Sequence, residues 1–234
     1  MEALQLARHE DLEAVGRLPL FACVREQEVS EIMGSARRRT YQRGQVIHHV
    51  DDVAGDVFVI VKGHVKHRLL ASDGRQITHN IQGPINFFGM MSVLDGKRRA
   101  GDAVALTDCE VLVIDSEIIA SFLARHPEAN SVLLKRYVGS ARRMEMMLHD
   151  QAFLSVPMRL AKVLLEYAVH EGDSPTDELV VPSYLNQTEL ACLVGTSRES
   201  VNQSLKQFSF WGWIESDRKN IHVLDAPALR TFAC

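Results

Sequence analysis

Glycines divide residues 41–115 into short segments rich in Val, Ile and Phe, and this spacing restricts the fold more than any other feature of the sequence. Segments of this length are typical of β-strands. Residues 56–63 predict a strand that ends in a glycine turn, and the pair Asp73-Gly74 is typical of a tight hairpin. A succession of antiparallel hairpins predicts a β-barrel or β-roll. The glycines are Gly44, Gly55, Gly63, Gly74, Gly83, Gly89, Gly96 and Gly101.

Helical periodicity lies on both sides of this β-rich region. Val29, Ile32 and Met33 have the spacing of one helix face, which predicts a helix over 26–36 that caps the roll. A short helix is predicted over 116–125, and His126-Pro127 begins the next one, since proline favours the first turn of a helix.

The longest helical pattern runs from about residue 127 to 151 and has a heptad-like stripe. This stripe predicts a dimerisation helix, with an ordinary helix inside one domain as the alternative. A second stripe, one residue further on, widens the face, so we expect the helix to contact both its own roll and a partner helix. The residues assigned to the dimer are Leu133, Tyr137, Ser140, Met144 and Met147.

Residues 186–206 predict two helices around a glycine turn. Asn186 and Ser197 stand where N-caps are expected, and Leu190 and Val194 would pack against Leu205. The second helix would then expose polar side chains that can hydrogen-bond to base edges in the major groove. The residues predicted to contact DNA from this helix are Ser197, Arg198, Glu199, Asn202, Gln203 and Lys206.

Two further strands, 213–216 and 221–224, predict a wing whose turn carries Arg218 and Lys219. Cations there would contact phosphates without selecting sequence. The alternative is a helical hairpin for protein contact, beside a solvated charged turn. Acidic residues outnumber basic ones after residue 153, so we expect DNA binding to require two modules on one duplex.

Composition excludes several other classes. A net charge of -4 argues against binding polyanions over the whole surface. The chain has no apolar stretch of transmembrane length and an acidic start unlike a signal peptide, so a cytoplasmic protein without a membrane partner is expected.

The four cysteines form no C-x-x-C pair, and neither H-x-H nor H-E-x-x-H occurs. Neither a metal site nor an enzyme is therefore predicted, and the cysteines are expected to be mostly buried, reduced thiols.

Over residues 18 to 230 the pattern resembles the cyclic-AMP receptor protein and fumarate-nitrate regulator (Crp/Fnr) family. Residues 87–100 look like its phosphate-binding cassette, 153–161 like the start of its DNA-binding domain, and 195–201 like its recognition helix. The resemblance implies a transcription regulator, an activator if it contacts RNA polymerase, that binds double-stranded DNA as a homodimer on a pseudo-palindromic operator. Gln203 stands where the family usually has a second Arg, so the preferred operator is expected to differ from the family consensus.

The expected fold is therefore α+β. An N-terminal segment (1–17) precedes a cyclic-nucleotide-binding-like jelly roll, here called the β-roll (18–125). A long dimerisation helix (126–152) and a C-terminal winged helix-turn-helix (153–234) follow. The turn-rich stretch 171–177 is the candidate surface for RNA polymerase, with a solvated loop as the alternative.

The cassette departs from that of members that bind cyclic AMP. Arg99 remains, but Met90 replaces the Glu that would bind ribose and Ala100 replaces a Ser that would bind phosphate. A ribose hydroxyl without an acceptor costs about 1 to 3 kcal/mol, so cyclic AMP is disfavoured and the effector is left unassigned. An apolar, methionine-lined pocket would favour a hydrophobic effector. The candidate pocket residues are Gly89, Met90, Met91, Arg99, Ala100, Met144 and Glu145.

Three alternatives stay open. Five histidines in the roll keep a haem-binding member among them, although exposed strand positions explain most of these residues. A sensor or adaptor acting by protein contact is the second, and a regulator that needs no effector is the third. The five histidines are His48, His49, His64, His67 and His79.

Overall fold

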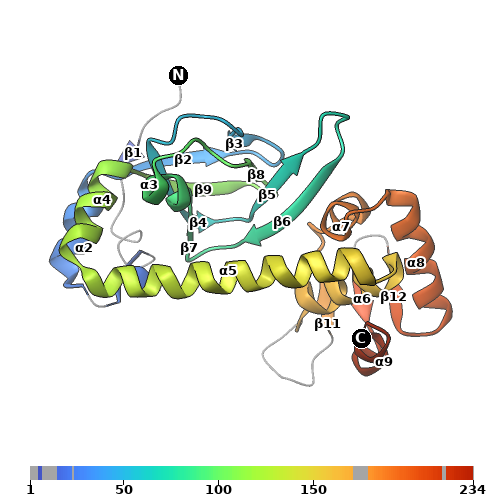
Figure 1. Cartoon of the computed structure of the whole chain (residues 1–234). Coiled ribbons are helices and arrows are strands. Elements are labelled where there is room, and N and C mark those ends of the chain that lie inside the picture. The colour runs from blue at the N-terminus through green and yellow to red at the C-terminus, as the bar shows by residue number, and fades with distance from the viewer. Residues whose placement is uncertain (1–4, 7–14, 23, 171–178, 218–219, 234) are drawn as a thin grey trace. The chain divides into compact units, whose positions relative to one another are not determined.

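The computed structural model describes residues 5–6, 15–22, 24–170, 179–217 and 220–233. Its elements form an α+β fold with three antiparallel sheets and one long helix (Figure 1). By contacts between Cα atoms the chain divides into two compact units. The first contains residues 1–70 and 79–142, and the second contains 71–78 and 143–234.

Within the described residues the β-roll has one sheet of five strands, one of which comes from the N-terminal segment, and one sheet of four. The five-stranded sheet has the order β1 (Gln5–Leu6), β2 (Arg37–Tyr41), β9 (Cys109–Asp115), β4 (Asp56–Lys62) and β7 (Asn86–Phe88). The four-stranded sheet has the order β3 (Val46–His48), β8 (Asp102–Ala105), β5 (Val65–Leu70) and β6 (Gln76–Gln82).

Successive side chains of a strand point to opposite sides, and in β4 both sides are covered by apolar clusters. Val57 and Val59 belong to a cluster packed on the helices of the roll, which we call the outer cluster. Phe58 and Ile60 belong to a second cluster, between the two sheets, which we call the inner cluster. This explains why residues 57–61 are continuously apolar.

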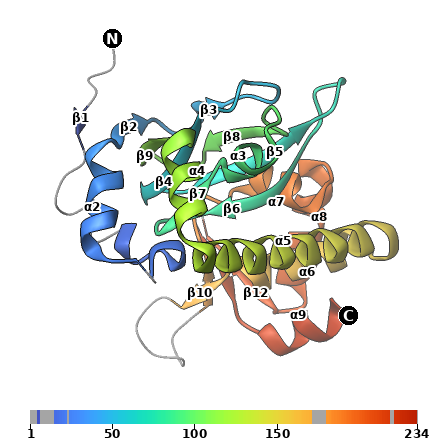
Figure 2. The same cartoon turned by 60° about the vertical axis from the view of Figure 1, so that its left-hand side comes forward.

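The helices of the roll are short. They are η1 (Pro19–Phe21), α2 (Glu26–Gly34), α3 (Met90–Asp95) and α4 (Ser116–Arg125). Phe21 contacts Phe122 with a ring-centroid distance of 5.0 Å, which joins η1 to α4 in the outer cluster. In both cartoon views α2 and α4 lie at the same end of the roll (Figure 2).

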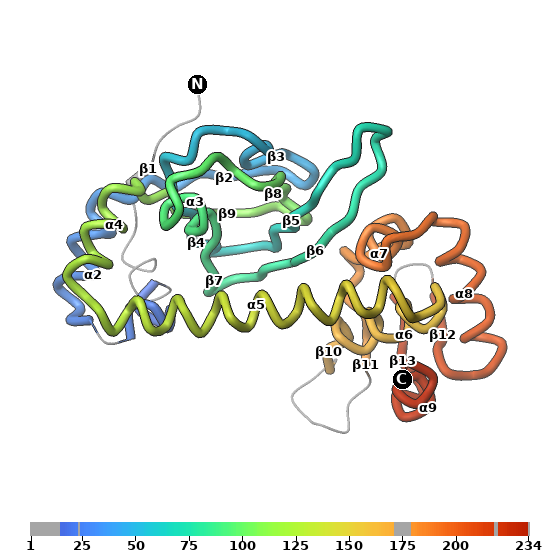
Figure 3. The backbone as a smooth tube through the Cα atoms, in the orientation of Figure 1, coloured from blue at the N-terminus to red at the C-terminus, as the bar shows by residue number. Residues whose placement is uncertain are grey.

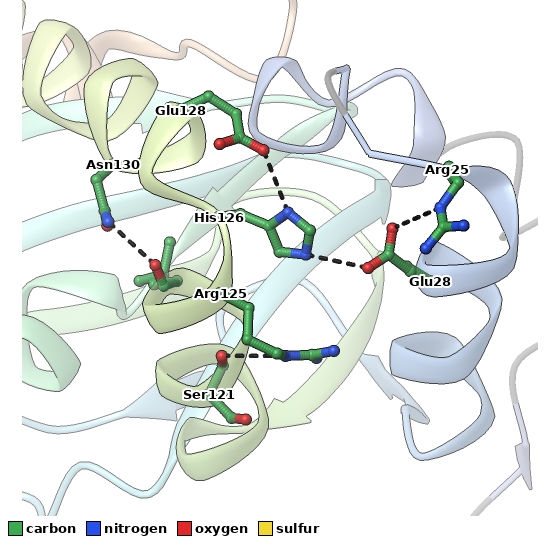
Figure 4. A network of polar contacts seen from close by, with 8 residues as sticks. Arg25, Glu28, Ser121, Arg125, His126, Glu128 and Asn130 are labelled. Carbon is green, nitrogen blue, oxygen red and sulfur yellow. Dashed lines mark hydrogen bonds and ion pairs between the residues drawn. The ribbon is translucent and has the colours of Figure 1, made fainter.

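The long helix α5 (Pro127–Phe153) continues directly from α4 (Figure 3). Its start is tied to α2, because the two ring nitrogens of His126 lie 3.2 Å from carboxylate oxygens of Glu28 and Glu128 (Figure 4). Asn130 Nδ2 also donates to Leu123 O at 3.0 Å. These contacts join α2, α4 and the first turn of α5.

The second unit continues with a helix-turn-helix and a small sheet. Its helices are α6 (Val156–Tyr167), α7 (Gln187–Val194), α8 (Arg198–Phe210) and α9 (Ala226–Phe232). The sheet has the order β10 (Val169–His170), β11 (Leu179–Val181), β13 (Ile221–Val223) and β12 (Ile214–Ser216).

Several sequence predictions are confirmed to within a few residues. The strand predicted over 56–63 is β4, the helix predicted over 116–125 is α4, and the long helix reaches two residues beyond 151. The Asp73-Gly74 hairpin forms, with Ala71 N donating to Arg75 O at 2.8 Å. Helices α3 and α9 were not predicted, since each has only one or two turns.

Candidate functional site

The candidate reading surface is built on α7 and α8, and both helices begin at a side-chain cap. Asn186 Oδ1 accepts hydrogen bonds from Thr188 N and Glu189 N at 2.9 and 3.1 Å. Ser197 Oγ accepts one from Ser200 N at 3.2 Å. Such caps satisfy amides that have no partner inside the helix. The predicted capping roles of Asn186 and Ser197 are confirmed.

The turn between these helices requires a glycine. Gly195 ends α7 with a φ of 70°, a left-handed conformation that residues with a Cβ atom rarely adopt. A Cβ atom there would also lie 2.7 Å from Gln151 Nε2. Gln151 Nε2 donates to Val194 O at 2.8 Å, and Arg159 Nε donates to the same oxygen at 3.0 Å. Side chains of α5 and α6 therefore hold the end of α7.

The two helices meet along an apolar seam. Leu190 and Val194 of α7 and Val201 and Leu205 of α8 are all buried. Phe208 is buried further along α8, in contact with the rings of Trp211 and Trp213. The buried face of α8 packs against the rest of the second unit, so the opposite face of α8 is exposed to solvent.

That opposite face carries the predicted DNA contacts. Arg198, Glu199 and Gln203 are exposed, and Asn202 is half-buried. Hydrogen bonds from its own backbone amide and from Ser197 lower the pKa of Glu199, so this carboxylate is an acceptor at neutral pH. The four side chains offer the donors and acceptors that can read base edges. Lys206 and Ser197 are also exposed.

The wing predicted after α8 is present as β12 and β13. Their register pairs Ile214 with Val223, and Asp217 Oδ1 accepts from Asn220 N at 2.6 Å beside the turn. Arg218 and Lys219, the predicted phosphate contacts, lie outside the described residues, as does the turn 171–177.

The cassette residues are placed differently from the expectation of a methionine-lined pocket. Met90 is 1% exposed and packs in the outer cluster, while Phe58 of β4 faces the inner cluster. Met91 and Ala100 are exposed. This arrangement follows from Gly89, which precedes α3 with a φ of 85° and so turns the chain at the start of the cassette helix.

Arg99 is held by the backbone of its own roll. It is 4% exposed, and its Nη1 and Nη2 donate to Gly89 O at 2.7 Å and Asp56 O at 2.5 Å. The guanidinium also lies over the Phe58 ring at 5.6 Å from its centroid. Met144 and Glu145, the other predicted pocket residues, belong to the second unit and are exposed.

The first two residues assigned to the dimer pack against their own β-roll. Leu133 is 3% exposed in the outer cluster, and Tyr137 packs against that cluster. The second stripe is the exposed one, with Leu134 at 66% and Leu148 at 71%. The assignment of Leu133 to a partner helix is therefore wrong, because Leu133 fills the core of its own roll. Ser140 and Met147 are half-buried, and Met144 is exposed.

The histidines of the roll were expected mostly at exposed strand positions, but of the five only His49 is exposed, and three of the others lie together. The rings of His48 and His67 contact Phe88 of the inner cluster at centroid distances of 6.0 and 5.1 Å, and His79 lies 6.2 Å from His67. We call His48, His67 and His79 the imidazole cluster. Their positions on three separate strands hid this grouping. Among the described residues no three metal-binding side chains are placed to hold a metal ion.

The comparisons with known proteins agree with this architecture. Residues 38–126 match the family described as cyclic nucleotide-binding domain, and residues 158–232 match the family described as Crp-like helix-turn-helix domain. None of the described helices is long and apolar enough to cross a membrane.

Two curated relatives are similar over nearly the whole chain. The CRP-like cAMP-activated global transcriptional regulator of Mycobacterium tuberculosis is 31% identical over 217 residues, which cover 93% of this chain and 97% of that protein. The cyclic AMP receptor protein of Thermus thermophilus is 27% identical over 215 residues, which cover 92% and 96%.

Solved structures show the same fold. The structure of FixK2 from Bradyrhizobium japonicum has a TM-score of 0.75 at 21% identity, covering 85% of this chain and 98% of that one. From its two matched domains and from its relatives, the chain belongs to the Crp/Fnr family of transcription regulators.

Proposed function

We propose that this regulator binds a pseudo-palindromic operator as a homodimer and responds to an effector other than cyclic AMP. The observation that carries the proposal is helix α8. It is capped at Ser197, buried along one face, and exposes Arg198, Glu199 and Gln203 near its start. The first residues of a recognition helix are the ones that reach base edges in the major groove.

The exposed face of α5 supports a homodimer. Leu134, Val138 and Leu148 are large apolar side chains left exposed, and their separations of four and ten residues place them on one stripe of alternating four- and three-residue steps, which suits a helix pair. Two modules on one duplex would also offset the acidic balance of the C-terminal region, because each module alone neutralises few phosphates.

The cassette supports an effector other than cyclic AMP. The M. tuberculosis relative is named as cAMP-activated. In this chain, however, Met90 packs in the outer cluster and the terminal nitrogens of Arg99 donate to backbone carbonyls. These two hydrogen bonds use two of the five N–H groups of the guanidinium, so a cyclic phosphate would have to share Arg99 with the backbone of the roll. We place the regulator in the cytoplasm, where it would contact RNA polymerase if it activates transcription.

Fluorescence anisotropy with a library-selected duplex tests the reading helix. We expect Arg198→Ala and Glu199→Ala each to weaken specific binding by about 1 to 3 kcal/mol and to relax the sequence preference. Ser209→Ala, an exposed position further along the same helix, is the matched control and should bind like the wild type. Addition of cyclic AMP should leave the affinity unchanged.

Three outcomes would contradict the proposal. Equal affinity of the wild type and the Arg198→Ala variant for every duplex would remove α8 from DNA recognition. A large gain in affinity with cyclic AMP would restore that nucleotide as the effector. Sedimentation of the free protein as a monomer, and binding of one chain per duplex, would remove the homodimer.

A further inference from the structure

The backbone oxygen of Val194 joins the last turn of α5 to the turn between α7 and α8. Val194 is the last residue of α7, and the final carbonyls of a helix have no partner inside that helix. Two side chains donate to this oxygen, Gln151 Nε2 at 2.8 Å and Arg159 Nε at 3.0 Å. Because Val194 is 1% exposed, its carbonyl depends on these two side chains for its hydrogen bonds.

The two donors come from different helices of the second unit. Arg159 belongs to α6, which contacts α7, α8 and α9, and its Nη1 also donates to Leu154 O at 2.9 Å. We call the four helices α6 to α9 the reading module. Gln151 belongs to the last turn of α5 (Figure 1). Arg159 therefore holds the turn to the rest of the reading module, whereas Gln151 holds it to the long helix.

Few residues separate this carbonyl from the side chains predicted to read DNA. The turn between the helices contains Gly195, Thr196 and Ser197. Ser197 caps α8, whose first residue is Arg198. A Cβ atom at Gly195 would lie 2.7 Å from Gln151 Nε2 and 3.3 Å from two more atoms of the same amide group. The amide of Gln151 therefore packs against the turn as well as donating to it, and it restricts the direction in which α8 begins.

A separate contact joins α5 to the reading module. Lys162 Nζ of α6 donates to Asp150 Oδ1 of α5 at 2.6 Å, and both side chains are largely buried. This ion pair does not involve Gln151. Loss of the Gln151 amide should therefore leave the reading module folded and attached to α5, and should free only the turn that precedes α8.

In a homodimer that pairs through α5, the direction of each α8 relative to its own α5 decides how far apart the two reading helices lie. The spacing of the two half-sites in the operator follows from that distance. We propose that Gln151 is a positioning residue for DNA recognition, which fixes the start of α8 against α5 and thereby sets the half-site spacing that the homodimer selects. The inference deepens the proposed function and rests on it. Base preference within a half-site stays with Arg198 and Glu199.

Two sets of duplexes test the proposal with the full-length protein. The first set carries one half-site. The second carries two half-sites whose separation grows by one base pair at a time, which moves one of them by about 3.4 Å and turns it by about a tenth of a turn.

We expect Gln151→Met, which has a similar length but no donor, to bind the best-spaced duplex about tenfold more weakly than the wild type. The variant should also discriminate less between neighbouring spacings, because its turn is no longer fixed to α5. Its affinity for the single half-site and its ranking of bases should match the wild type.

Further variants separate positioning from folding. Gln151→Glu keeps the size of the side chain but places a carboxylate against Val194 O, so it should lose spacing selectivity in the same way as Gln151→Met. The test then does not depend on one variant. Gln207→Met makes the same change at an exposed glutamine of α8 and should bind like the wild type. Circular dichroism and thermal unfolding establish that each variant is folded.

The proposal is overturned if both Gln151 variants keep the spacing selectivity of the wild type. It is also overturned if they lose as much affinity for the single half-site as for the paired half-sites, because a residue that only maintains the reading module would give that result. Failure of the proposed function looks different. The wild type itself would then show no preferred spacing, or would bind both sets no more tightly than Arg198→Ala, and this inference would fall with it.

Discussion

Gln82 and Arg136 donate hydrogen bonds to the same backbone oxygen, that of Phe87. Gln82 Nε2 lies 3.4 Å from it and Arg136 Nη2 lies 3.0 Å from it. Gln82 also contacts His67 of the imidazole cluster, while Arg136 belongs to the long helix α5. A continuous set of hydrogen bonds therefore runs from the inner face of the roll to α5.

Loss of the Arg136 side chain should loosen this connection. Arg136 also donates to Asn86 Oδ1 at 3.3 Å and lies over the Phe87 ring at 4.2 Å. We expect Arg136→Met to lower the free energy of unfolding by about 1 to 3 kcal/mol, since hydrogen bonds to a charged group are lost. Hydrogen exchange should increase at β7 and along α5. Lys135→Met, at the exposed neighbouring position, is the control. Equal exchange in the two variants would contradict the connection.

Gly195 should be more sensitive to substitution than another glycine with the same backbone. Gly195 and Gly212 have φ values of 70° and 74°, but only a Cβ at Gly195 would meet another group, Gln151 Nε2. A left-handed conformation costs a residue with a Cβ about 1 to 2 kcal/mol. We expect Gly212→Ala to lose about that much stability in urea titrations, and Gly195→Ala to lose more and to bind DNA less well. Equal losses would show that Gln151 moves aside freely.

Lys206 should contribute affinity without sequence preference. It is exposed on α8, three residues after Gln203. A phosphate contact releases counterions, so we expect Lys206→Gln to reduce the slope of log affinity against log salt concentration by about 1 for each module and to leave the ranking of duplexes unchanged. The slope is measured between 50 and 200 mM salt, a range of about fourfold. A changed ranking would indicate that Lys206 reads a base instead.

Acid should destabilise the roll through His48 and His67. Their folded-state pKa values of about 4 and about 3 lie below the unfolded value of 6.5. The unfolded chain therefore binds more protons below pH 6.5, and the stability present above that pH is lost as the pH falls toward the folded-state values. Between about pH 7.5 and 5.5 each histidine should remove up to about 1.4 kcal/mol.

Thermal unfolding at the two pH values measures this effect. The wild type should lose more stability on acidification than His67→Gln, which has no titrating group at that position. His49→Ala should follow the wild type, because His49 is exposed. The same loss in all three proteins would assign the acid sensitivity to other groups.

Local features of the sequence predicted local structure well. The run 56–62 formed β4 as an uninterrupted strand, and Asn186 and Ser197 cap α7 and α8. These features depend on backbone preferences and on hydrogen bonds between residues two or three positions apart, so a short segment contains the information. The exposed polar face of α8 followed from the same helical spacing.

Contacts between segments that are distant in the sequence could not be predicted from local patterns. The two stripes of α5 differ by one residue in sequence, and only packing against the outer cluster shows that Leu133 faces inward while Leu134 faces outward. The same holds for Met90, whose side depends on the turn at Gly89.

The sequence alone determined the order of roll, long helix and winged helix-turn-helix, together with the polar residues of the reading helix, because periodicity and capping act within one element. Only the tertiary structure brought His48, His67 and His79 together and placed Gln82 and Arg136 on one carbonyl. Those groupings depend on which strands are neighbours in a sheet and on how a helix packs, and both are decided by burial of apolar surface over the whole unit.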